Sequence, residues 1–245
     1  MMNLVIPMAG KSSSFSKEGI NTPKPYLKIN GLSMVHRAYL SLDLDEHINK
    51  AYFIALDEHR ETYKVTQEIE KFCDKAVTIF LPEITSGPAE TISKLEGIIP
   101  DNEPMLQSNV DQVLDWESSR FIEFLHTNEL DAALVTINTV DPHYSFARYD
   151  KNRVALNVTE KQVISNEGLI GTHYWKKASD YFRSYKEAKK QGLTYNDETY
   201  VSHTFNPLIQ EGKIVRDYKL KQHEKQHVIG SPKDLERFSL LINYE

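Results

Sequence analysis

Hydrophobic residues in the first part of the chain gather in short runs, and amphipathic segments separate these runs. Apolar runs with the length of buried strands lie at 4–8, 51–56, 77–81, 105–110 and 132–137. Segments with apolar residues at helical spacing lie between them, at 33–42, 57–72, 89–98 and 117–125. Strands that alternate with helices in this way predict an α/β fold with a doubly wound, mostly parallel sheet.

After about residue 140 the pattern changes, and shorter β-like pieces replace the regular alternation. We expect strands at 145–149, 153–158, 169–175 and 214–220, and helices at 178–190, 198–210 and 233–242. The chain contains no recognisable linker, repeat or low-complexity segment. The simplest prediction is therefore a single domain over residues 1–245 with a β-rich second half.

The composition is ordinary for a soluble globular protein, with 40% hydrophobic and 26% charged residues among 245. The formal net charge of −6 argues against broad nucleic-acid binding, which needs a positive surface, but it allows a local cationic pocket. No apolar stretch approaches the ~20 residues of a membrane span. No charged segment precedes the first apolar run, as it would in a signal peptide. We therefore expect a cytoplasmic protein without a membrane partner.

The segment 3–25 carries the first candidate chemistry. Its apolar run stops at Ala9 and Gly10, a serine-rich loop with Ser12, Ser13 and Ser14 follows, and Lys24 then stands between two prolines. Loops of Gly and Ser after a strand let backbone N–H groups approach a phosphate closely. Flanking prolines have a fixed φ, so they hold the lysine on a stiff backbone. The segment predicts a site for a phosphorylated ligand.

This combination of strand, Ala-Gly loop and Pro-Lys-Pro resembles the sugar-phosphate nucleotidylyltransferases, which have a GT-A-like, Rossmann-like fold. These enzymes join a nucleoside triphosphate to a phosphorylated acceptor and release pyrophosphate. The resemblance implies that residues 1–140 form a nucleotide-binding half and residues 141–245 an acceptor-binding half. It implies nucleotide contacts for the loop residues named above, and catalytic roles for Lys24 and Lys11 as cations that neutralise phosphates.

The same loop departs from the family pattern Ala-Gly-x-Gly-Ser-Arg-Phe. Ser12 stands at the second glycine, and Ser14 stands at the arginine that clamps the leaving phosphates. A serine cannot copy the bidentate fork of a guanidinium group. Lys11 or Lys17 is a candidate for supplying the missing charge.

A second motif, residues 108–112, ends the fourth apolar run. Ligands of open α/β sheets collect beyond the carboxyl ends of strands, and a carboxylate there can bind Mg²⁺ that bridges triphosphate oxygens. The family's metal aspartate corresponds to Asp111, and Asn109 becomes a nucleotide-binding candidate. The alternative is that Asp111 caps the following helix. Many members of the family carry a second metal aspartate at the position where this chain has Val228. The neighbouring His227 is a possible metal ligand, although an isolated histidine is more often structural.

Three further segments resemble substrate-binding motifs of the family. Residues 87–91 resemble a base-recognition turn, with Gly87 and Glu90 as nucleotide-binding candidates; alternatively, Ser86 caps a helix here. Glu160 and Lys161 resemble an acceptor-binding pair whose lysine contacts the acceptor phosphate, but such a pair is also common on solvated surfaces.

The third of these segments, 196–201, resembles a motif in which Glu198 faces the acceptor. The alternative is the start of a helix, with Asn196 or Asp197 as its cap and acidic residues near its positive end.

Together these motifs predict a Mg²⁺-dependent nucleotidylyltransferase. The 108–112 and 196–201 segments resemble most the enzymes of bacterial capsule and surface-polysaccharide synthesis, so CTP is the favoured nucleotide. Phosphoglutamine or a sugar phosphate is the candidate acceptor, and a homo-oligomer is possible. Two alternatives stay open: a GT-A-type glycosyltransferase, although 109–111 keeps only the second acid of its Asp-x-Asp motif, and a non-catalytic nucleotide-binding relative.

Overall fold

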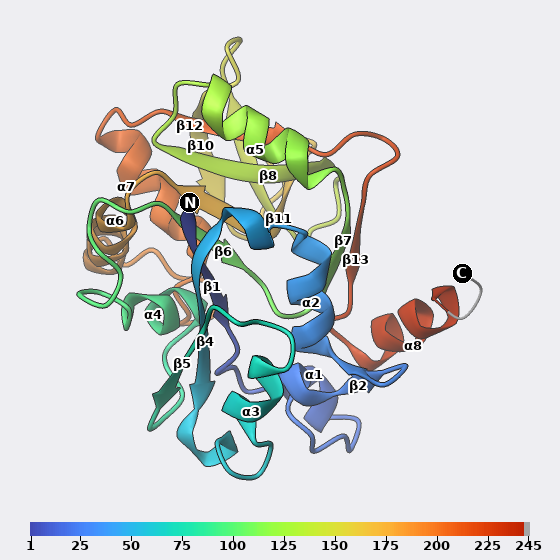
Figure 1. The fold of residues 1–245 in the computed structure, drawn as a ribbon. Coiled ribbons are helices and arrows are strands. Elements are labelled where there is room, and N and C mark those ends of the chain that lie inside the picture. Colours follow the sequence, from blue (N-terminus) through green and yellow to red (C-terminus); the bar gives the residue numbers. More distant parts are fainter. Residues whose placement is uncertain (243–245) are drawn as a thin grey trace.

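The computed structural model describes residues 1–242, and a nine-stranded mixed sheet organises it (Figure 1). Four strands of the first half pair in parallel in the order β6-β1-β4-β5. Their bounds are β1 (Met2–Pro7), β4 (Ile48–Leu56), β5 (Ala76–Leu81) and β6 (Met105–Ser108). Crossover connections that contain helices, as the alternating sequence pattern predicted, give these strands the same direction.

The rest of the sheet is built around one long strand, β11 (Glu167–Trp175), which runs antiparallel to β6, β8 and β9. The remaining strands are β8 (Ala132–Asn138), β9 (Ser145–Tyr149), β10 (Ala155–Thr159) and β12 (Val215–Lys219). One sheet thus takes strands from both sides of residue 140. The single domain and its division into a nucleotide half and an acceptor half stay predictions.

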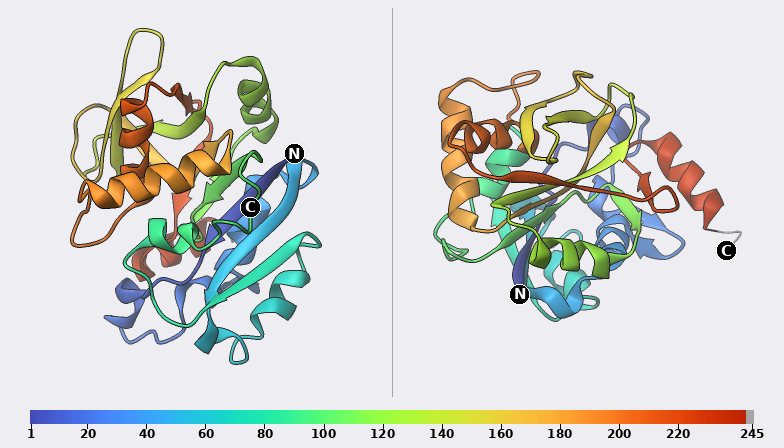
Figure 2. Two further views of the ribbon diagram at one scale, coloured as in Figure 1. Left: turned by 90° about the vertical axis from the view of Figure 1, so that its left-hand side faces the viewer. Right: turned by 90° about the horizontal axis from the view of Figure 1, so that it is seen from above.

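Helices cover both faces of the sheet (Figures 1 and 2). One face packs against α2 (Met34–Leu42), α3 (Val65–Glu70) and α5 (Ser118–Thr127). The other packs against α4 (Pro88–Ser93), α6 (Ala178–Lys190) and α7 (Phe205–Gln210). Successive residues of β1 alternate between the two cores, Leu4 and Ile6 in one and Val5 in the other. Burial on both faces explains why these strands are almost continuously apolar in sequence.

The expected α/β, doubly wound fold is confirmed, but three predicted helices are shorter than the sequence suggested. The 57–72 segment forms a 3-10 turn, Asp57–His59, and then α3, because Lys64 adopts a left-handed φ of 47° that interrupts the helix. The helix predicted at 89–98 ends at Ser93 in α4. The 198–210 segment becomes the 3-10 helix η4 (Val201–Thr204) followed by α7.

A small separate sheet was not predicted. It pairs β7 (Gln112–Asp115) with β13 (Lys225–Val228) in antiparallel fashion, and each has four residues. Strands this short give little periodic signal. The chain continues from β13 into α8 (Pro232–Leu241), which projects from the body of the molecule (Figure 2). None of the helices within residues 1–242 is long and apolar enough to cross a membrane.

Candidate active site

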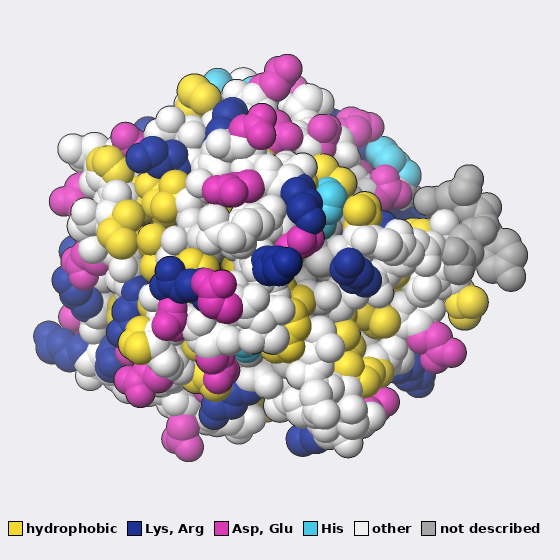
Figure 3. Space-filling model, turned by 60° about the horizontal axis from the view of Figure 1, so that its bottom comes forward, with side chains coloured by type: hydrophobic (Ala, Val, Ile, Leu, Met, Phe, Trp, Pro, Cys, Tyr) yellow, Lys and Arg dark blue, Asp and Glu magenta, His cyan; other side chains and the backbone are white. Residues whose placement is uncertain are grey.

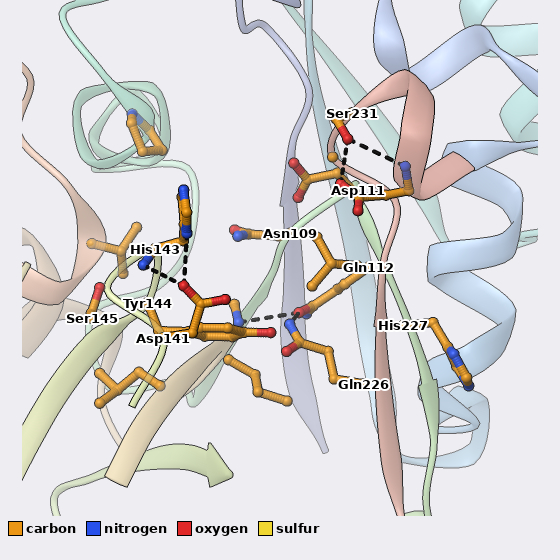
Figure 4. Close-up of a pocket in the computed structure, with 18 of the residues that line it drawn as sticks. Asn109, Asp111, Gln112, Asp141, His143, Tyr144, Ser145, Gln226, His227 and Ser231 are labelled. Atoms are coloured by element: carbon orange, nitrogen blue, oxygen red, sulfur yellow. Dashed lines mark hydrogen bonds and ion pairs between the residues drawn. The ribbon is translucent and has the colours of Figure 1, made fainter. Parts of the chain in front are cut away.

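A cavity of about 1140 Å³ opens beyond the carboxyl end of β6. Its walls come from the β6–β7 segment, the segment after β10, the middle of β11, η4, β13 and α8. Figure 4 shows Asn109, Asp111 and Gln112 on one side of this space and Asp141 and Tyr144 on the other. The position agrees with the rule that ligands of open α/β sheets bind beyond the carboxyl ends of the strands.

Lys24 and Asp111 meet at the edge of this cavity, although 87 residues separate them in sequence. The Lys24 Nζ atom lies 2.8 Å from Oδ2 of Asp111, and the side chains are 19% and 29% exposed. Lys24 begins the 3-10 helix η1 (Lys24–Tyr26) between its two prolines, and its backbone N–H donates to Oγ of Ser12 at 2.8 Å. The proline-flanked cation and the carboxylate after β6 therefore share one site.

The backbone around Asp111 shows that this residue does not cap a helix. β7 follows it directly, and α5 begins only at Ser118. The Asp111 carbonyl accepts a hydrogen bond from the Ile229 N–H at 2.8 Å, which links the β6–β7 turn to the segment before α8. The capping alternative is thus wrong, and the carboxylate is left to face the cavity.

The Asp111 carboxylate is the candidate magnesium ligand, and its Oδ2 atom accepts a hydrogen bond from the Lys24 ammonium. Among residues 1–242, no group of three or more His, Cys, Asp or Glu side chains is arranged to hold a metal. His227 points away from Asp111 in Figure 4, with its ring 5.4 Å from that of Phe238. Mg²⁺ commonly takes one or two carboxylates, with waters and substrate phosphates completing its shell. Asp111 alone suits that mode.

The serines of the first loop hold neighbouring loops together. Ser12 adopts a left-handed conformation with φ 51°, which agrees with the glycine that the family has there. Oγ of Ser14 donates to the Gly230 carbonyl at 2.8 Å. Ala9 is buried, Gly10, Lys11 and Ser13 are exposed, and Ser13 begins the short helix α1 (Ser13–Ser16). Lys11 and Lys17, the two candidates for the missing charge, are both exposed.

The predicted base-recognition turn has a structural function in this conformation. Gly87, with φ 147°, is the N-cap of α4, and a Cβ there would lie 2.8 Å from the Thr199 carbonyl oxygen. The expected cap by Ser86 is wrong: its N–H and hydroxyl instead donate to the Glu90 carboxylate. These bonds to Ser86, with Lys94 adding to them, lower the pKa of Glu90 to about 2. Glu90 is thus ionised and held at the helix start.

Glu160 and Lys161 form an anchored pair in the cavity wall and not a solvated surface pair. The Glu160 side chain is 5% exposed, and its Oε2 accepts hydrogen bonds from the hydroxyls of Ser145 and Ser202. The Lys161 Nζ donates to the Tyr200 hydroxyl at 3.2 Å. Burial lowers the pKa of Lys161, but the Tyr200 bond and the nearby Glu160 outweigh it and leave the pKa raised.

Glu198 lies outside the set of residues that line the cavity. It closes a turn with Tyr195, whose backbone exchanges hydrogen bonds with that of Glu198 at 2.9 and 3.1 Å. Asn196 and Asp197 occupy the centre of this turn with positive φ values, and Tyr200 is the N-cap of η4. The alternative of a helix start capped by Asn196 or Asp197 is therefore wrong.

Several polar residues of the cavity were missed in the sequence. Gln112 donates from Nε2 to Oγ1 of Thr172 at 2.7 Å and accepts from the Gly171 N–H at 3.1 Å. Gly171 leaves room for Asn109, because a Cβ there would lie 2.2 Å from Asn109 Nδ2. Asn109 Oδ1 accepts from Gln107 Nε2 at 2.8 Å. The available signal was Gln107 itself, a polar residue in a strand that is buried along its length.

Charge on the outer surface is mixed. On the face shown in Figure 3, Lys and Arg side chains are interspersed with Asp and Glu. A phosphorylated ligand would therefore depend on local cations, of which Lys24 and Lys161 are held by hydrogen bonds at the site.

Comparison with solved structures shows which class of fold holds this cavity. A nucleoside-diphosphate-sugar pyrophosphorylase from Vibrio cholerae RC9 superposes with a TM-score of 0.83 at 21% identity, covering 97% of this chain and 99% of the other. A UDP-glucose pyrophosphorylase, solved with UDP-glucose, gives 0.81 at 16% identity and covers 100% and 99%. The inositol-1-phosphate CTP transferase from T. maritima gives 0.77 at 13% identity and covers 99% and 95%.

The chain thus has the Rossmann-like fold of these nucleotidyltransferases along its whole length, as the sequence resemblance implied. Comparison of the sequence with protein-family models and with curated proteins finds no match. At these identities the likeness establishes the fold, so the activity has to be argued from the site.

Proposed function

We propose that this protein is a nucleotidylyltransferase that joins a nucleoside triphosphate to a phosphorylated small-molecule acceptor and releases pyrophosphate. The contact between Lys24 and Asp111 at the cavity edge carries the proposal. It brings a fixed cation and a carboxylate together beyond the carboxyl ends of the parallel strands, where open α/β sheets bind ligands, and Glu160 and Lys161 face the same cavity. Such an arrangement suits two phosphorylated ligands that meet in one space.

The reaction needs no nucleophile from the protein. A phosphate oxygen of the acceptor attacks the α-phosphorus of the nucleotide, a new P–O bond forms, and the bond to pyrophosphate breaks. Positioning and electrostatic stabilisation then carry the catalysis. Lys24 neutralises charge at the α-phosphate, Lys11 meets the leaving phosphates, Lys161 binds the acceptor phosphate, and Glu160 orients the acceptor.

Asp111 would hold Mg²⁺, with substrate phosphates and waters as the other ligands. The ion supplies charge neutralisation at the phosphates of the nucleotide when it is bound. Ala9, Gly10, Asn109 and the loop serines are the proposed nucleotide contacts. Within this proposal Glu90 serves the nucleotide site by fixing the start of α4 next to Gly87.

The finer assignment is CTP as the nucleotide and phosphoglutamine or a sugar phosphate as the acceptor, in capsule or surface-polysaccharide precursor synthesis. Its support is the motif resemblance and the presence of a CTP transferase among the related structures. A cytoplasmic location and a possible homo-oligomer are part of the same proposal.

One observation favours a second candidate, a non-catalytic nucleotide-binding relative. Ser14, at the place of the family's arginine, is engaged with the Gly230 carbonyl and provides no cation for the leaving phosphates. A protein of this kind would bind Mg²⁺–nucleotide without turning it over.

A matrix of the four nucleoside triphosphates against phosphorylated acceptors, followed by pyrophosphate release, tests the proposal. The acceptors should include glucose 1-phosphate, inositol 1-phosphate, phosphoglutamine and phosphocholine. We expect pyrophosphate with at least one pair, dependent on Mg²⁺ and lost in Asp111→Asn. Tight nucleotide binding with no pyrophosphate from any pair would favour the non-catalytic relative.

A further inference from the structure

Three buried polar atoms in the cavity wall have no partner among the described residues. They are Oε1 of Gln107, Nδ1 of His173 and Oε1 of Gln226. Gln107 and His173 are 0% and 5% exposed, and they stand directly opposite each other on β6 and β11. Opposed residues of an antiparallel pair have their Cβ atoms about 5 Å apart on the same face of the sheet. The two side chains therefore form one polar patch in the wall of the cavity.

The amide orientation of Gln107 is fixed by its neighbours. Its Nε2 lies 2.8 Å from Oδ1 of Asn109 and 3.4 Å from the Gly171 carbonyl oxygen. A carbonyl oxygen can only accept, so the amide nitrogen must face it. The Oε1 atom is then a buried acceptor that requires a donor, and a buried acceptor without one is costly.

The imidazole of His173 is neutral, because burial lowers its pKa to about 3. Its ring is enclosed by aromatic neighbours, with ring centroids at 5.3 Å for Phe205 and 6.3 Å for Trp175. A neutral imidazole nitrogen either donates or accepts, according to its tautomer. A hydroxyl or an N–H group in the cavity can satisfy it together with Gln107.

We propose that Gln107 and His173 determine acceptor specificity by binding an O–H or N–H group at the non-phosphate end of the acceptor. This inference rests on the proposed nucleotidylyltransferase function. The patch lies in the same cavity as Glu160 and Lys161, so one acceptor can place its phosphate at Lys161 and its donor group on the patch. Acceptors whose far end carries a hydroxyl, amine or carboxamide are favoured, and acceptors without such hydrogens are rejected.

Three phosphorylated acceptors that differ in their hydrogen-bond donors test this proposal. Phosphoethanolamine offers N–H donors, glucose 1-phosphate offers O–H donors, and phosphocholine offers neither in its quaternary headgroup. In the wild-type protein we expect a kcat/KM for at least one donor-bearing acceptor that is about 10- to 100-fold above that for phosphocholine, since an unmet buried acceptor costs that much. The better of the two donor-bearing acceptors identifies the source of the hydrogen.

The variants are Gln107→Met and His173→Phe, which keep side-chain volume and remove the polar atoms. We expect each to reduce the preference over phosphocholine by about 10-fold or more. His173→Phe should leave the KM for the nucleotide unchanged, whereas Gln107→Met also removes the hydrogen bond to Asn109. Thr136→Val is the matched control, because Oγ1 of Thr136 is also buried without a partner among residues 1–242 but lies outside the cavity lining. It should leave the preference as it is.

The outcomes separate this inference from the proposed function. Pyrophosphate release with an unchanged preference in both cavity variants would keep the function and overturn the specificity patch. If no acceptor yields pyrophosphate, calorimetric binding of the same three phosphates to wild type and variants decides the matter. Equal affinities for all three, or no binding of a donor-bearing phosphate at millimolar concentration, would overturn the patch. A variant that loses its thermal transition is replaced by Gln107→Asn, for which the same loss of preference is expected.

Discussion

Removing the charge of Lys24 should damage catalysis far more than stability. Opposite unit charges 2.8 Å apart attract by roughly 6 kcal/mol at an effective dielectric constant of about 20, before desolvation is counted. Because the side chains of Lys24 and Asp111 are 19% and 29% exposed, the net contribution to stability is only about 1 kcal/mol. For a chain of this length, such a loss lowers the melting temperature by about 2–4 °C.

The expected catalytic effect of Lys24→Met is a loss of about 100-fold in kcat, which corresponds to about 2.7 kcal/mol of transition-state stabilisation. Asp111→Asn should give a loss of similar size. Pyrophosphate release and thermal unfolding, measured on the same preparations, separate the two effects. A double variant should lose less than the product of the single losses, since both groups act on the same phosphates.

Lys213→Met provides the matched control for this experiment. The Lys213 ammonium lies 3.2 Å from Oδ1 of Asp131, and the side chains are 31% and 30% exposed, but the pair lies outside the cavity lining. This variant should lose a comparable amount of stability and keep full activity. The reasoning is refuted if Lys24→Met retains wild-type turnover, or if its loss of activity is matched by Lys213→Met.

Three other outcomes are expected. Gly171→Ala should lower stability by about 1–3 kcal/mol and reduce activity, because its Cβ would lie 2.2 Å from Nδ2 of Asn109. Urea unfolding measures this loss of stability, and an unchanged unfolding midpoint would contradict the close packing. Glu90→Gln should lower the free energy of unfolding at pH 7, because the bonds to Ser86 lower the pKa of Glu90 from 4.5 to about 2. This loss of stability should shrink as the pH falls below about 4.5 and vanish near pH 2. A loss that is equal at pH 7 and pH 2 would contradict this. Lys11→Ala should raise the KM for the nucleotide about 10-fold, because the leaving phosphates are the proposed partner of Lys11. Its thermal stability should stay normal, because Lys11 is exposed. An unchanged KM would show that Lys11 does not bind the nucleotide.

Much of the fold was readable in the sequence because its strands are buried on both faces. Such strands are continuous apolar runs, and α6 (Ala178–Lys190) was predicted with its observed bounds because its apolar face is long and regular. The failures have local causes. Lys64 adopts a left-handed conformation in the middle of a periodic segment, and the strands β7 and β13 pair residues that are 110 to 116 positions apart in sequence. A local hydrophobic pattern cannot indicate that a strand pairs with another strand so far away in the sequence.

The candidate site was predictable where a residue type is chemically specific. A lysine between two prolines and an aspartate after a buried strand were each singled out in the sequence, and the structure brings Lys24 and Asp111 together. The roles of Glu90 and Glu198 could not be read in the same way. Their side chains belong to local turns whose hydrogen bonds depend on left-handed residues and helix starts, and these are poorly encoded by composition.

The first loop differs from the family pattern at Ser12 and Ser14, and both serines make hydrogen bonds that hold the loop in place. In the family pattern a glycine supplies the left-handed turn and an arginine reaches the leaving phosphates. Here Ser12 makes the turn at φ 51° and accepts from the Lys24 N–H, while Ser14 ties the loop to Gly230 ahead of α8. The serines thus fix the position of Lys24 relative to Asp111 without adding charge. In the proposed reaction, positive charge for the leaving group then comes from an exposed lysine, so salt should weaken nucleotide binding more than it would at an arginine-clamped site.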